Sequence, residues 1–269
     1  MNIKKLFTAF DQHIDRSEDK SLGRRDFFKS AGSLGKQAAI VAAPAIILAM
    51  LPKASFAQSS SIPDVLNFAL TLEYFEDEFY KAGLAASGLI PSSDKAIFLQ
   101  ISKHESAHVA FLKTALGSAA VDKPTFDFTG GGSFPDALTN YDTFLALSQS
   151  FEDTGVRAYK GQAGNLASDN NTLKAALQIH SVEARHASEV RRLRGAASGM
   201  DIKGWITSNQ SNGAPAAIYE GEDNQTHGGA NLASLDPLNN ISADARTEAF
   251  DEALTKDQVL AIVSPFIVM

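Results

Sequence analysis

Four segments of the chain place apolar side chains at alternating steps of three and four residues. This is the spacing of a helix that buries one face. The segments span about residues 63–83, 94–116, 134–159 and 171–194, and proline, serine or glycine flanks them. Four helices of this kind have to bury their apolar faces against one another, so the pattern predicts a four-helix bundle.

The connections between the segments constrain how the helices are joined. The first and second helices, and the third and fourth, are separated by loops of roughly 6–10 residues, which suit antiparallel neighbours. About 18 residues, Gly117 to Phe134, separate the second and third helices. Extended at about 3.3 Å per residue, this linker can run the length of a helix of roughly 30 residues. The sequence therefore predicts an all-α fold, with two helical hairpins joined by one long crossover.

Acidic residues interrupt the apolar faces of all four helices. Glu73 and Glu152 lie in the first and third helices, and Glu105-Ser106-Ala107-His108 and Glu183-Ala184-Arg185-His186 lie in the second and fourth. In a Glu-x-x-His motif the two side chains share one helical face, so they can bind the same cation. Burying an unpaired carboxylate is costly, and no lysine or arginine lies on these faces. Two metal cations would supply the missing positive charge.

The two halves of the bundle carry the same pattern. Glu73 precedes Tyr80 by seven residues, and Glu152 precedes Tyr159 by seven residues. Each of these glutamates is followed, 32 and 31 residues later, by the glutamate of a Glu-x-x-His motif. A single motif of this kind is more often a solvated, ion-pairing face. The matching halves together predict a dinuclear site, with one motif on each ion and bridging carboxylates.

Three further side chains near the motifs allow more than one interpretation. Glu76 is also on the inner face, opposite Gly155 in the repeat, and is either an extra ligand, a base beside the metals or a carboxylate that points to solvent. His104 is expected to face away from the bundle core, at the surface. His180 lies one turn before the fourth-helix motif and can hydrogen-bond a ligand.

Cysteine is absent from the chain. This excludes disulfides, thiolate metal sites and iron–sulfur clusters. Any metal must be bound by oxygen and imidazole, and this ligand set suits iron or manganese, with zinc as a competitor.

The first 57 residues have the composition of an export signal. Arg24 and Arg25 precede Phe27-Phe28-Lys29, an apolar run of about 14 residues and the small residues that end at Ala57. The paired arginines match a twin-arginine signal. The alternative is a retained tether, although the run is shorter than the roughly 20 residues that span a membrane. We expect cleavage after Ala57 and a location in the periplasm or cell envelope.

Removal of residues 1–57 leaves an acidic protein. That segment carries 9 Lys and Arg and 5 Asp and Glu, so residues 58–269 carry 15 against 26, a net charge of −11. Such a protein lacks the basic face that nucleic-acid binding needs, and it can attract cations. No later segment is apolar for long enough to cross a bilayer, so no membrane span is expected after signal removal.

The chain changes character after Gly195. Residues 196–242 are rich in Gly, Asn, Ser and Ala, with Trp205 and Tyr219 as isolated anchors. A final helix is predicted over 243–263, with an apolar stripe of Phe250, Leu254, Val259 and Ile262. The expected organisation is a signal peptide (1–57), a bundle (58–195) and a C-terminal extension packed on the bundle (196–269).

The order Glu, Glu-x-x-His, Glu, Glu-x-x-His on four helices resembles the ferritin-like di-iron carboxylate superfamily, over about residues 62–194. The segments Asn67–Tyr74 and Ala249–Glu252 resemble its exported, desiccation-related branch. The resemblance implies a ferritin-like bundle that binds two iron (or manganese) ions. It implies as ligands Glu73, Glu105, His108, Glu152, Glu183 and His186, with Tyr80 and Tyr159 as candidate catalytic donors of electrons or protons.

Three functions are compatible with these features. The site is a redox centre that acts on oxygen or peroxide and protects the envelope from oxidative stress, or it binds and stores metal or stabilises the cell surface during drying without turnover. In the third interpretation the metals are structural and the extension binds a partner. The sequence leaves open whether the protein is an enzyme, which metal it binds and whether it forms a homo-oligomer.

Overall fold

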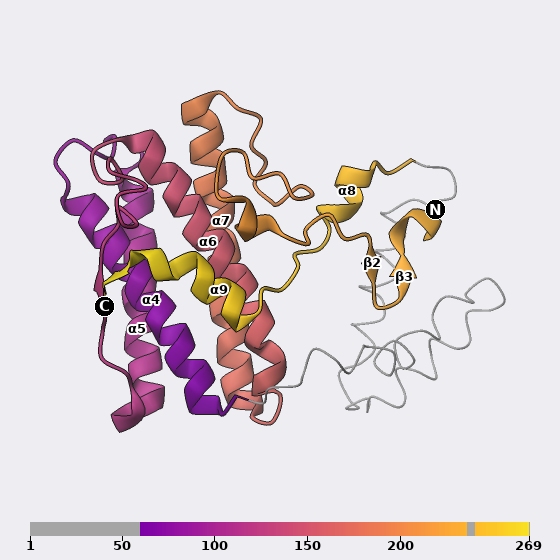
Figure 1. Ribbon diagram of the computed structural model, residues 1–269, viewed down its shortest axis with the longest axis horizontal. Coiled ribbons are helices and arrows are strands. Elements are labelled where there is room, and N and C mark those ends of the chain that lie inside the picture. The colour runs from indigo at the N-terminus through magenta and orange to yellow at the C-terminus, as the bar shows by residue number, and fades with distance from the viewer. Residues whose placement is uncertain (1–59, 236–239, 269) are drawn as a thin grey trace, which may run out of the picture. The chain divides into compact units, whose positions relative to one another are not determined.

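The computed structural model describes residues 60–235 and 240–268, so the expected export signal lies outside the described residues. Four long helices form a bundle: α4 (Ile62–Ala85), α5 (Lys95–Leu116), α6 (Tyr141–Gln162) and α7 (Asn170–Ser198) (Figure 1). Helix α4 packs against α5, and α6 packs against α7. The predicted all-α bundle of two helical hairpins is confirmed. Within the described ranges, no helix combines the length and apolarity that crossing a membrane requires.

Side-chain caps mark where three of the four bundle helices begin. Ser61 forms a capping box at the start of α4. The side chains of Asn140 and Asp169 accept hydrogen bonds from the first free backbone amides of α6 and α7. Such caps satisfy amides that have no partner within the helix. Helix α6 therefore begins several residues later than predicted, and α7 continues through Gly195 to end before Gly199, whose φ is 70°.

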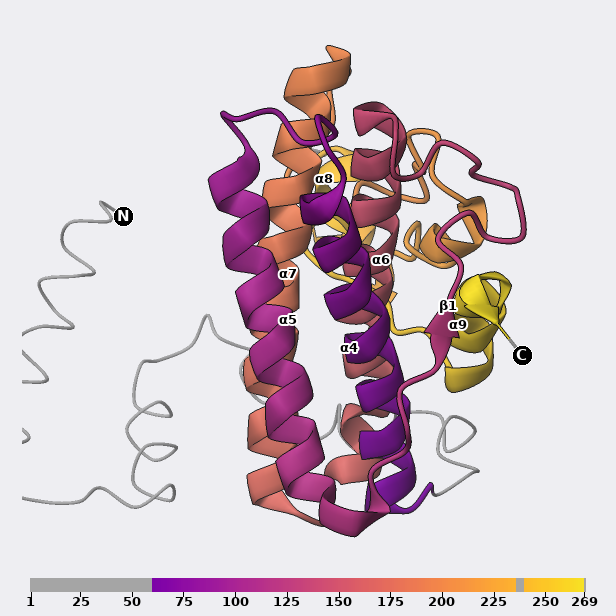
Figure 2. The same cartoon turned by 90° about the vertical axis from the view of Figure 1, so that its left-hand side faces the viewer.

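The crossover between α5 and α6 comprises residues 117–140 and runs along the bundle (Figure 2). It contains a 3₁₀ turn (Gly117–Ala119) and the short strand β1 (Thr125–Phe126). Strand β1 pairs antiparallel with β4 (Ile267–Val268). The crossover is thus fixed by residues far away in the sequence, which explains how so long a connection is ordered without a helix of its own.

Two apolar clusters fill the bundle on either side of a polar layer. One is rich in aromatic residues and includes Phe75, Phe79, Phe98, Phe144 and Phe151. The other is mainly aliphatic and includes Leu66, Leu70, Leu112, Leu166 and Ile179. The glutamates of the repeat lie between them, so apolar packing surrounds the polar layer at both ends.

The C-terminal extension consists of short elements. It contains 3₁₀ turns at Ala216–Tyr219, Leu232–Leu235 and Ser264–Phe266, the hairpin of β2 (Thr226–His227) and β3 (Ala230–Asn231), and helices α8 (Ala243–Thr247) and α9 (Lys256–Val263). The single helix predicted over 243–263 is wrong. Residues 248–255 separate α8 from α9, and Thr255 starts α9 with a capping box.

The apolar stripe predicted for this region is only partly buried. Leu254 and Val259 are buried, whereas Phe250 is 39% exposed and stacks on His227 at 3.8 Å. Of the two expected anchors, Tyr219 is fully buried and Trp205 is 49% exposed. Trp205 is therefore not an anchor of the extension.

Helix α6 approaches the extension closely at a glycine. The amide of Leu254 donates to the carbonyl oxygen of Arg157 at 3.2 Å. A Cβ atom on Gly161 would lie 2.0 Å from the carbonyl oxygen of Leu254, closer than any side chain could be placed. The absence of a side chain at Gly161 therefore allows the backbone of the extension to lie against α6.

A buried arginine of α6 binds backbone groups of the extension. Arg157 donates to the carbonyl oxygens of Glu252 at 2.8 Å and Glu220 at 2.6 Å, and its Nε lies 2.8 Å from a carboxylate oxygen of Glu222. Because a buried guanidinium needs partners for its donors, these contacts stabilise one conformation of the extension.

Helix α7 contributes a second buried network. Arg191 forms a bidentate ion pair with Asp153, at 2.9 and 2.5 Å. The Tyr219 hydroxyl donates to Asp153 at 2.8 Å and accepts from Gln149, which in turn accepts from Arg194. None of these buried charges was predicted from the sequence.

Candidate metal centre

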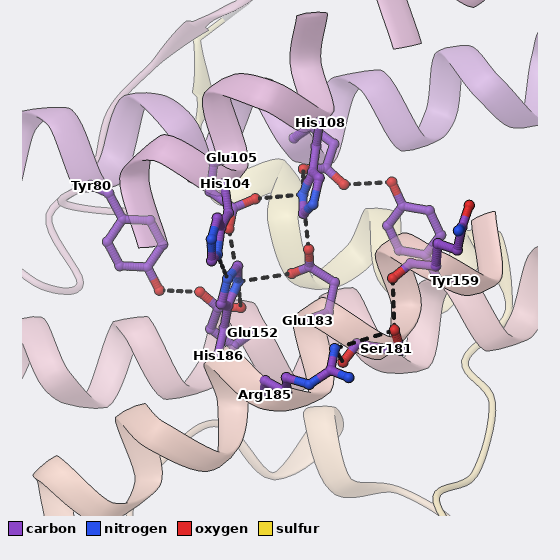
Figure 3. A network of polar contacts seen from close by, with 12 residues as sticks. Tyr80, His104, Glu105, His108, Glu152, Tyr159, Ser181, Glu183, Arg185 and His186 are labelled. Atoms are coloured by element: carbon purple, nitrogen blue, oxygen red, sulfur yellow. Dashed lines mark hydrogen bonds and ion pairs between the residues drawn. The ribbon is translucent and has the colours of Figure 1, made fainter. Parts of the chain in front are cut away.

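The six side chains of the repeated motifs meet in the polar layer of the bundle (Figure 3). Glu73 comes from α4, Glu105 and His108 from α5, Glu152 from α6, and Glu183 and His186 from α7. All four glutamates are 0% exposed, and His186 is 4% exposed. The structure therefore brings every predicted ligand together in one buried cluster.

His108 defines the first half of the cluster. Its Nδ1 lies 3.1 Å from Oε2 of Glu73, 3.2 Å from Oε2 of Glu105 and 3.1 Å from Oε1 of Glu183. Three carboxylate oxygens thus converge on one ring nitrogen. One cation in this region could be bound by three oxygens and a nitrogen.

His186 defines the second half in the same way. Its Nδ1 lies 2.9 Å from Oε1 of Glu105, 3.3 Å from Oε2 of Glu152 and 3.8 Å from Oε2 of Glu183. Glu105 and Glu183 each direct one carboxylate oxygen towards His108 and the other towards His186. The cluster therefore consists of two four-residue groups that share two carboxylates.

The hydrogen bonding of the cluster tests whether cations fit it. No hydrogen-bond partner is found in the described structure for Oε1 of Glu105, Oε2 of Glu152, both oxygens of Glu183 or Nδ1 of His186. Buried polar atoms are nearly always hydrogen-bonded in native proteins, and exceptions call for an explanation such as an ion. The unpaired atoms are carboxylate oxygens and an imidazole nitrogen, so the residues fit metal ions.

The pKa values show how the cluster balances its charge without metal. Burial alone would lower the pKa of His108, but the close carboxylates of Glu105, Glu183 and Glu73 raise it to about 12. The pKa of His186 is also raised, because Glu152 and Glu105 outweigh the effect of burial. Protons on the two histidines thus occupy the positions where cations would neutralise the glutamates.

The same environment raises the pKa values of some glutamates and lowers that of another. Burial raises the pKa of Glu152 to about 7 and that of Glu105 well above its ordinary value. For Glu183, the nearby imidazoles of His108 and His186 outweigh burial and lower the pKa to about 2. The metal-free cluster therefore retains protons at neutral pH, and these would have to leave as cations bind.

The two tyrosines of the repeat lie on opposite sides of the cluster (Figure 3). The Tyr80 hydroxyl of α4 donates to Oε1 of Glu152 on α6, and the Tyr159 hydroxyl of α6 donates to Oε1 of Glu73 on α4. Burial, followed by the partner glutamate, raises the pKa of both phenols well above the ordinary value. Both tyrosines therefore stay protonated and orient one glutamate each.

Glu76 also points towards the cluster. It is 3% exposed, so the alternative of a carboxylate that points to solvent is wrong. A Cβ atom on Gly155 would lie 3.1 Å from Oε1 of Glu76 and 3.4 Å from Oε2 of Glu183. Gly155 thus leaves room for a seventh carboxylate beside Glu183. Burial, and then the charges of Glu183 and Glu152, raise the pKa of Glu76 well above its ordinary value.

His104 is not the surface residue that we predicted. Its Nδ1 lies 2.8 Å from Nε2 of His186, the two rings stack with centroids 5.1 Å apart, and its Nε2 lies 2.7 Å from Nε2 of Gln100. His104 is one turn before His108, on the flank of α5 that faces α7 (Figure 3). The i, i+4 spacing of the two histidines was the signal that could have identified this contact.

His180 was predicted only as a candidate hydrogen-bond partner of a ligand. Its Nε2 is buried without a hydrogen-bond partner in the described residues, and burial lowers its pKa. His180 is absent from both ligand groups. The hydrogen bond to a ligand that its position suggested is not formed.

A helical bundle whose buried layer pairs two Glu-x-x-His motifs with two further glutamates has the architecture of a ferritin-like carboxylate protein. The sequence model of the ferritin-like domain family matches residues 62–196, half of the chain. The protein therefore belongs to the ferritin-like domain family. A search of curated proteins finds no match to the chain.

Proposed function

We propose that the protein binds two iron (or manganese) ions in this cluster and uses them as a redox centre that acts on dioxygen or hydrogen peroxide. The observation that carries the proposal is the pair of overlapping ligand groups, each with one histidine and three glutamates. In this arrangement Glu73 and His108 would hold one ion, Glu152 and His186 would hold the other, and Glu105 and Glu183, which belong to both groups, would be shared.

A pair of ferrous ions, when bound, supplies two electrons, which with two protons reduce dioxygen to hydrogen peroxide, or hydrogen peroxide to two waters. The residues of the chain provide the surroundings for this chemistry. Tyr80 and Tyr159 hold two terminal carboxylates in place, and the apolar clusters on either side exclude bulk water. Glu76, whose raised pKa favours its protonated form, can hold a proton beside Glu183 or act as a seventh ligand.

Metal binding without turnover is the second candidate. It is supported by the complete burial of the four glutamates and by the tyrosine hydrogen bonds that orient two of them. A site with this degree of burial suits ions that stay bound better than ions that pass through. Under this proposal the protein would store metal or stabilise the cell surface during drying.

Anaerobic loading with ferrous iron separates the two candidates. The redox proposal expects two ions per chain, rapid oxidation by dioxygen or hydrogen peroxide, and repeated turnover when a reductant is added. A chain that binds two ions but shows no more oxidation than free ferrous iron would support metal binding alone. A chain that binds no metal would contradict both candidates.

We also propose that the protein is exported by the twin-arginine route to the periplasm or cell envelope, as a member of the desiccation-related branch. Arg24 and Arg25 support this route. It carries folded proteins, which suits a metal centre buried within a bundle. Replacing both arginines with lysine should leave the precursor in the cytoplasm, and normal export of that variant would contradict the proposal.

A further inference from the structure

An apolar cavity of about 20 Å³ lies beside the metal centre. All four bundle helices contribute to its wall, which includes Leu66, Ala69, Leu112, Tyr159, Ala176 and Ile179. A cavity of this volume can hold one small molecule.

The cavity occupies the layer next to the ligands. Ala69, Leu112 and Ile179 each lie four residues from a residue of the cluster, so the cavity is about one helical turn, ~6 Å, away along the bundle. Tyr159 forms part of its wall and donates its hydroxyl hydrogen to Glu73. The cavity therefore ends at the Glu73–His108 half of the centre.

The cavity offers few hydrogen bonds to a polar guest. The hydroxyl of Thr172 in its wall donates to Asp169 at 2.9 Å, the hydroxyl of Tyr159 is already used by Glu73, and Gln162 accepts from Asn165 at 2.9 Å. A buried water needs two to four polar partners, and cavities without them stay dry. Water and hydrogen peroxide are therefore poor occupants, whereas a small apolar molecule gives up no hydrogen bonds when it enters the cavity.

The two ends of the centre differ in access. Phe111 on α5 borders the cavity and is 44% exposed, so the cavity wall reaches the protein surface. Tyr159 is 8% exposed. Tyr80, its counterpart, is 0% exposed and packs against Phe98 and Phe144, with ring centroids 6.0 and 6.4 Å away. Packing thus closes the Tyr80 side, and the cavity lies on the Tyr159 side.

We propose that this cavity admits dioxygen, a small apolar molecule, to the Glu73–His108 half of the centre. The inference rests on the redox function proposed above and names dioxygen, not hydrogen peroxide, as the oxidant. Phe111 marks the entrance, and Ala69 and Ala176 keep the passage open because their side chains are small.

Krypton, an apolar atom close to dioxygen in size, tests whether the cavity accepts such a guest. Crystals of the full chain pressurised with krypton should show the atom between Leu112, Tyr159 and Ile179. The Ala176→Leu variant fills the cavity and should abolish this density. Ala196→Leu places the same side chain at an exposed position of the same helix and should retain it. Absence of krypton from the wild-type cavity overturns the proposal.

The same variants test the route to the metals. In ferrous-loaded protein, Ala176→Leu should slow oxidation by dioxygen several-fold and leave metal content and oxidation by hydrogen peroxide unchanged, while Ala196→Leu should change neither. Equal slowing with both oxidants, or unchanged oxidation by dioxygen, overturns the proposal. Should Ala176→Leu fail to fold, krypton pressure on the wild type provides the same test, since the bound atom should slow oxidation by dioxygen alone. Failure to bind metal would overturn the redox function, whereas the crystals would still decide whether the cavity accepts an apolar guest.

Discussion

Tyr80 on α4 donates a hydrogen bond to Glu152 on α6, although its partner in the sequence repeat is Glu73, seven residues earlier on its own helix. Tyr159 on α6 donates in return to Glu73 on α4. The repeat is thus crossed in space, since each tyrosine orients the glutamate of the other half. The two helices that lack a Glu-x-x-His motif, α4 and α6, are therefore linked by hydrogen bonds within the candidate metal centre.

Replacing Tyr80 with phenylalanine should weaken this link. Glu152 would lose its donor while buried, and leaving a buried acceptor unsatisfied costs about 1–3 kcal/mol. Chemical denaturation of the metal-free variant should show that loss. Tyr141→Phe is the matched control, because it removes a hydroxyl that donates to Asp94 at 2.7 Å away from the centre. An equal or smaller loss for Tyr80→Phe would show that the crossed bond does not stabilise the cluster.

Glu105 is shared between the two ligand groups, so its replacement should affect both ions. We expect Glu105→Gln to reduce the metal content from two ions to fewer than one per chain. Glu78→Gln on α4, where the carboxylate pairs with Lys123 at 2.6 Å, should retain the wild-type content. Elemental analysis after anaerobic loading is the measurement. A Glu105→Gln protein that still binds two ions would rule out the bridging role.

His104 should control the affinity of the His186 half. When Nδ1 of His186 binds a metal ion, its Nε2 carries the proton and can donate to His104, which fixes the orientation of the ring. Loss of such a contact typically weakens metal binding by about 10- to 100-fold. Titration of His104→Ala with manganese, followed by paramagnetic resonance, should show one weakened site and one unchanged site. Lys103→Ala, at an exposed position on the same helix, should match the wild type. If both sites of His104→Ala bind manganese with wild-type affinity, the contact between His104 and His186 does not affect metal binding.

The stability of the metal-free protein should fall as pH rises. Burial raises the pKa of Glu152 from 4.5 to about 7, so its contribution is complete below 4.5 and is lost as pH rises through 7. The raised pKa of His108 contributes below 6.5 and is lost as pH rises towards about 12. Between about pH 5 and 9, both Glu152 and His108 therefore lower the free energy of unfolding of the metal-free protein as pH rises. Denaturation curves across this range should show the fall, and metal-loaded protein should lack it.

Two observations would test the cause of that pH dependence. Glu152→Gln removes one of the titrating groups, and its metal-free stability should vary less with pH than that of the wild type. A metal-free wild type that gains stability as pH rises would contradict the raised pKa values of Glu152 and His108.

Gly161→Ala should displace the extension from α6. The added methyl group would overlap the carbonyl oxygen of Leu254, which belongs to backbone and cannot rotate away. Overpacking of this kind costs about 1–3 kcal/mol, and limited proteolysis should cut the variant faster between residues 248 and 255. Lys160→Ala changes the neighbouring exposed position and should be cut at the wild-type rate. Equal cleavage of the two variants would show that the contact does not hold the extension.

The sequence predicted the four helices and the six central side chains because both depend on local periodicity. A buried helix face recurs every three to four residues, and charged groups at those positions are conspicuous. His104 was assigned wrongly because its contact depends on how closely α7 approaches the flank of α5. The direction of Glu76 could not be assigned, because it depends on the space that Gly155 leaves on a facing helix.

The extension was harder to predict for a related reason. Its apolar residues suggested one helix over 243–263, but the backbone around Leu254 is held against α6 by Arg157 and by the space at Gly161. These contacts come from residues about a hundred positions away in the sequence, so the local pattern of apolar residues does not predict them. The buried arginines were likewise missed, since their partners are mostly backbone carbonyls of the extension.

The pairing of β1 with β4 has a consequence for the order in which the protein can fold. Phe266, next to β4, packs against Phe75 and Phe151 with ring centroids 5.4 and 5.2 Å away. At ordinary rates of synthesis, about 10 to 40 seconds separate the appearance of Phe75 from that of Phe266. During this interval the first helical hairpin can form, but its aromatic surface stays uncovered and accessible to chaperones. Contacts between such distant residues also slow folding itself, so the aromatic cluster beside the candidate metal centre is completed only late in the maturation of the chain.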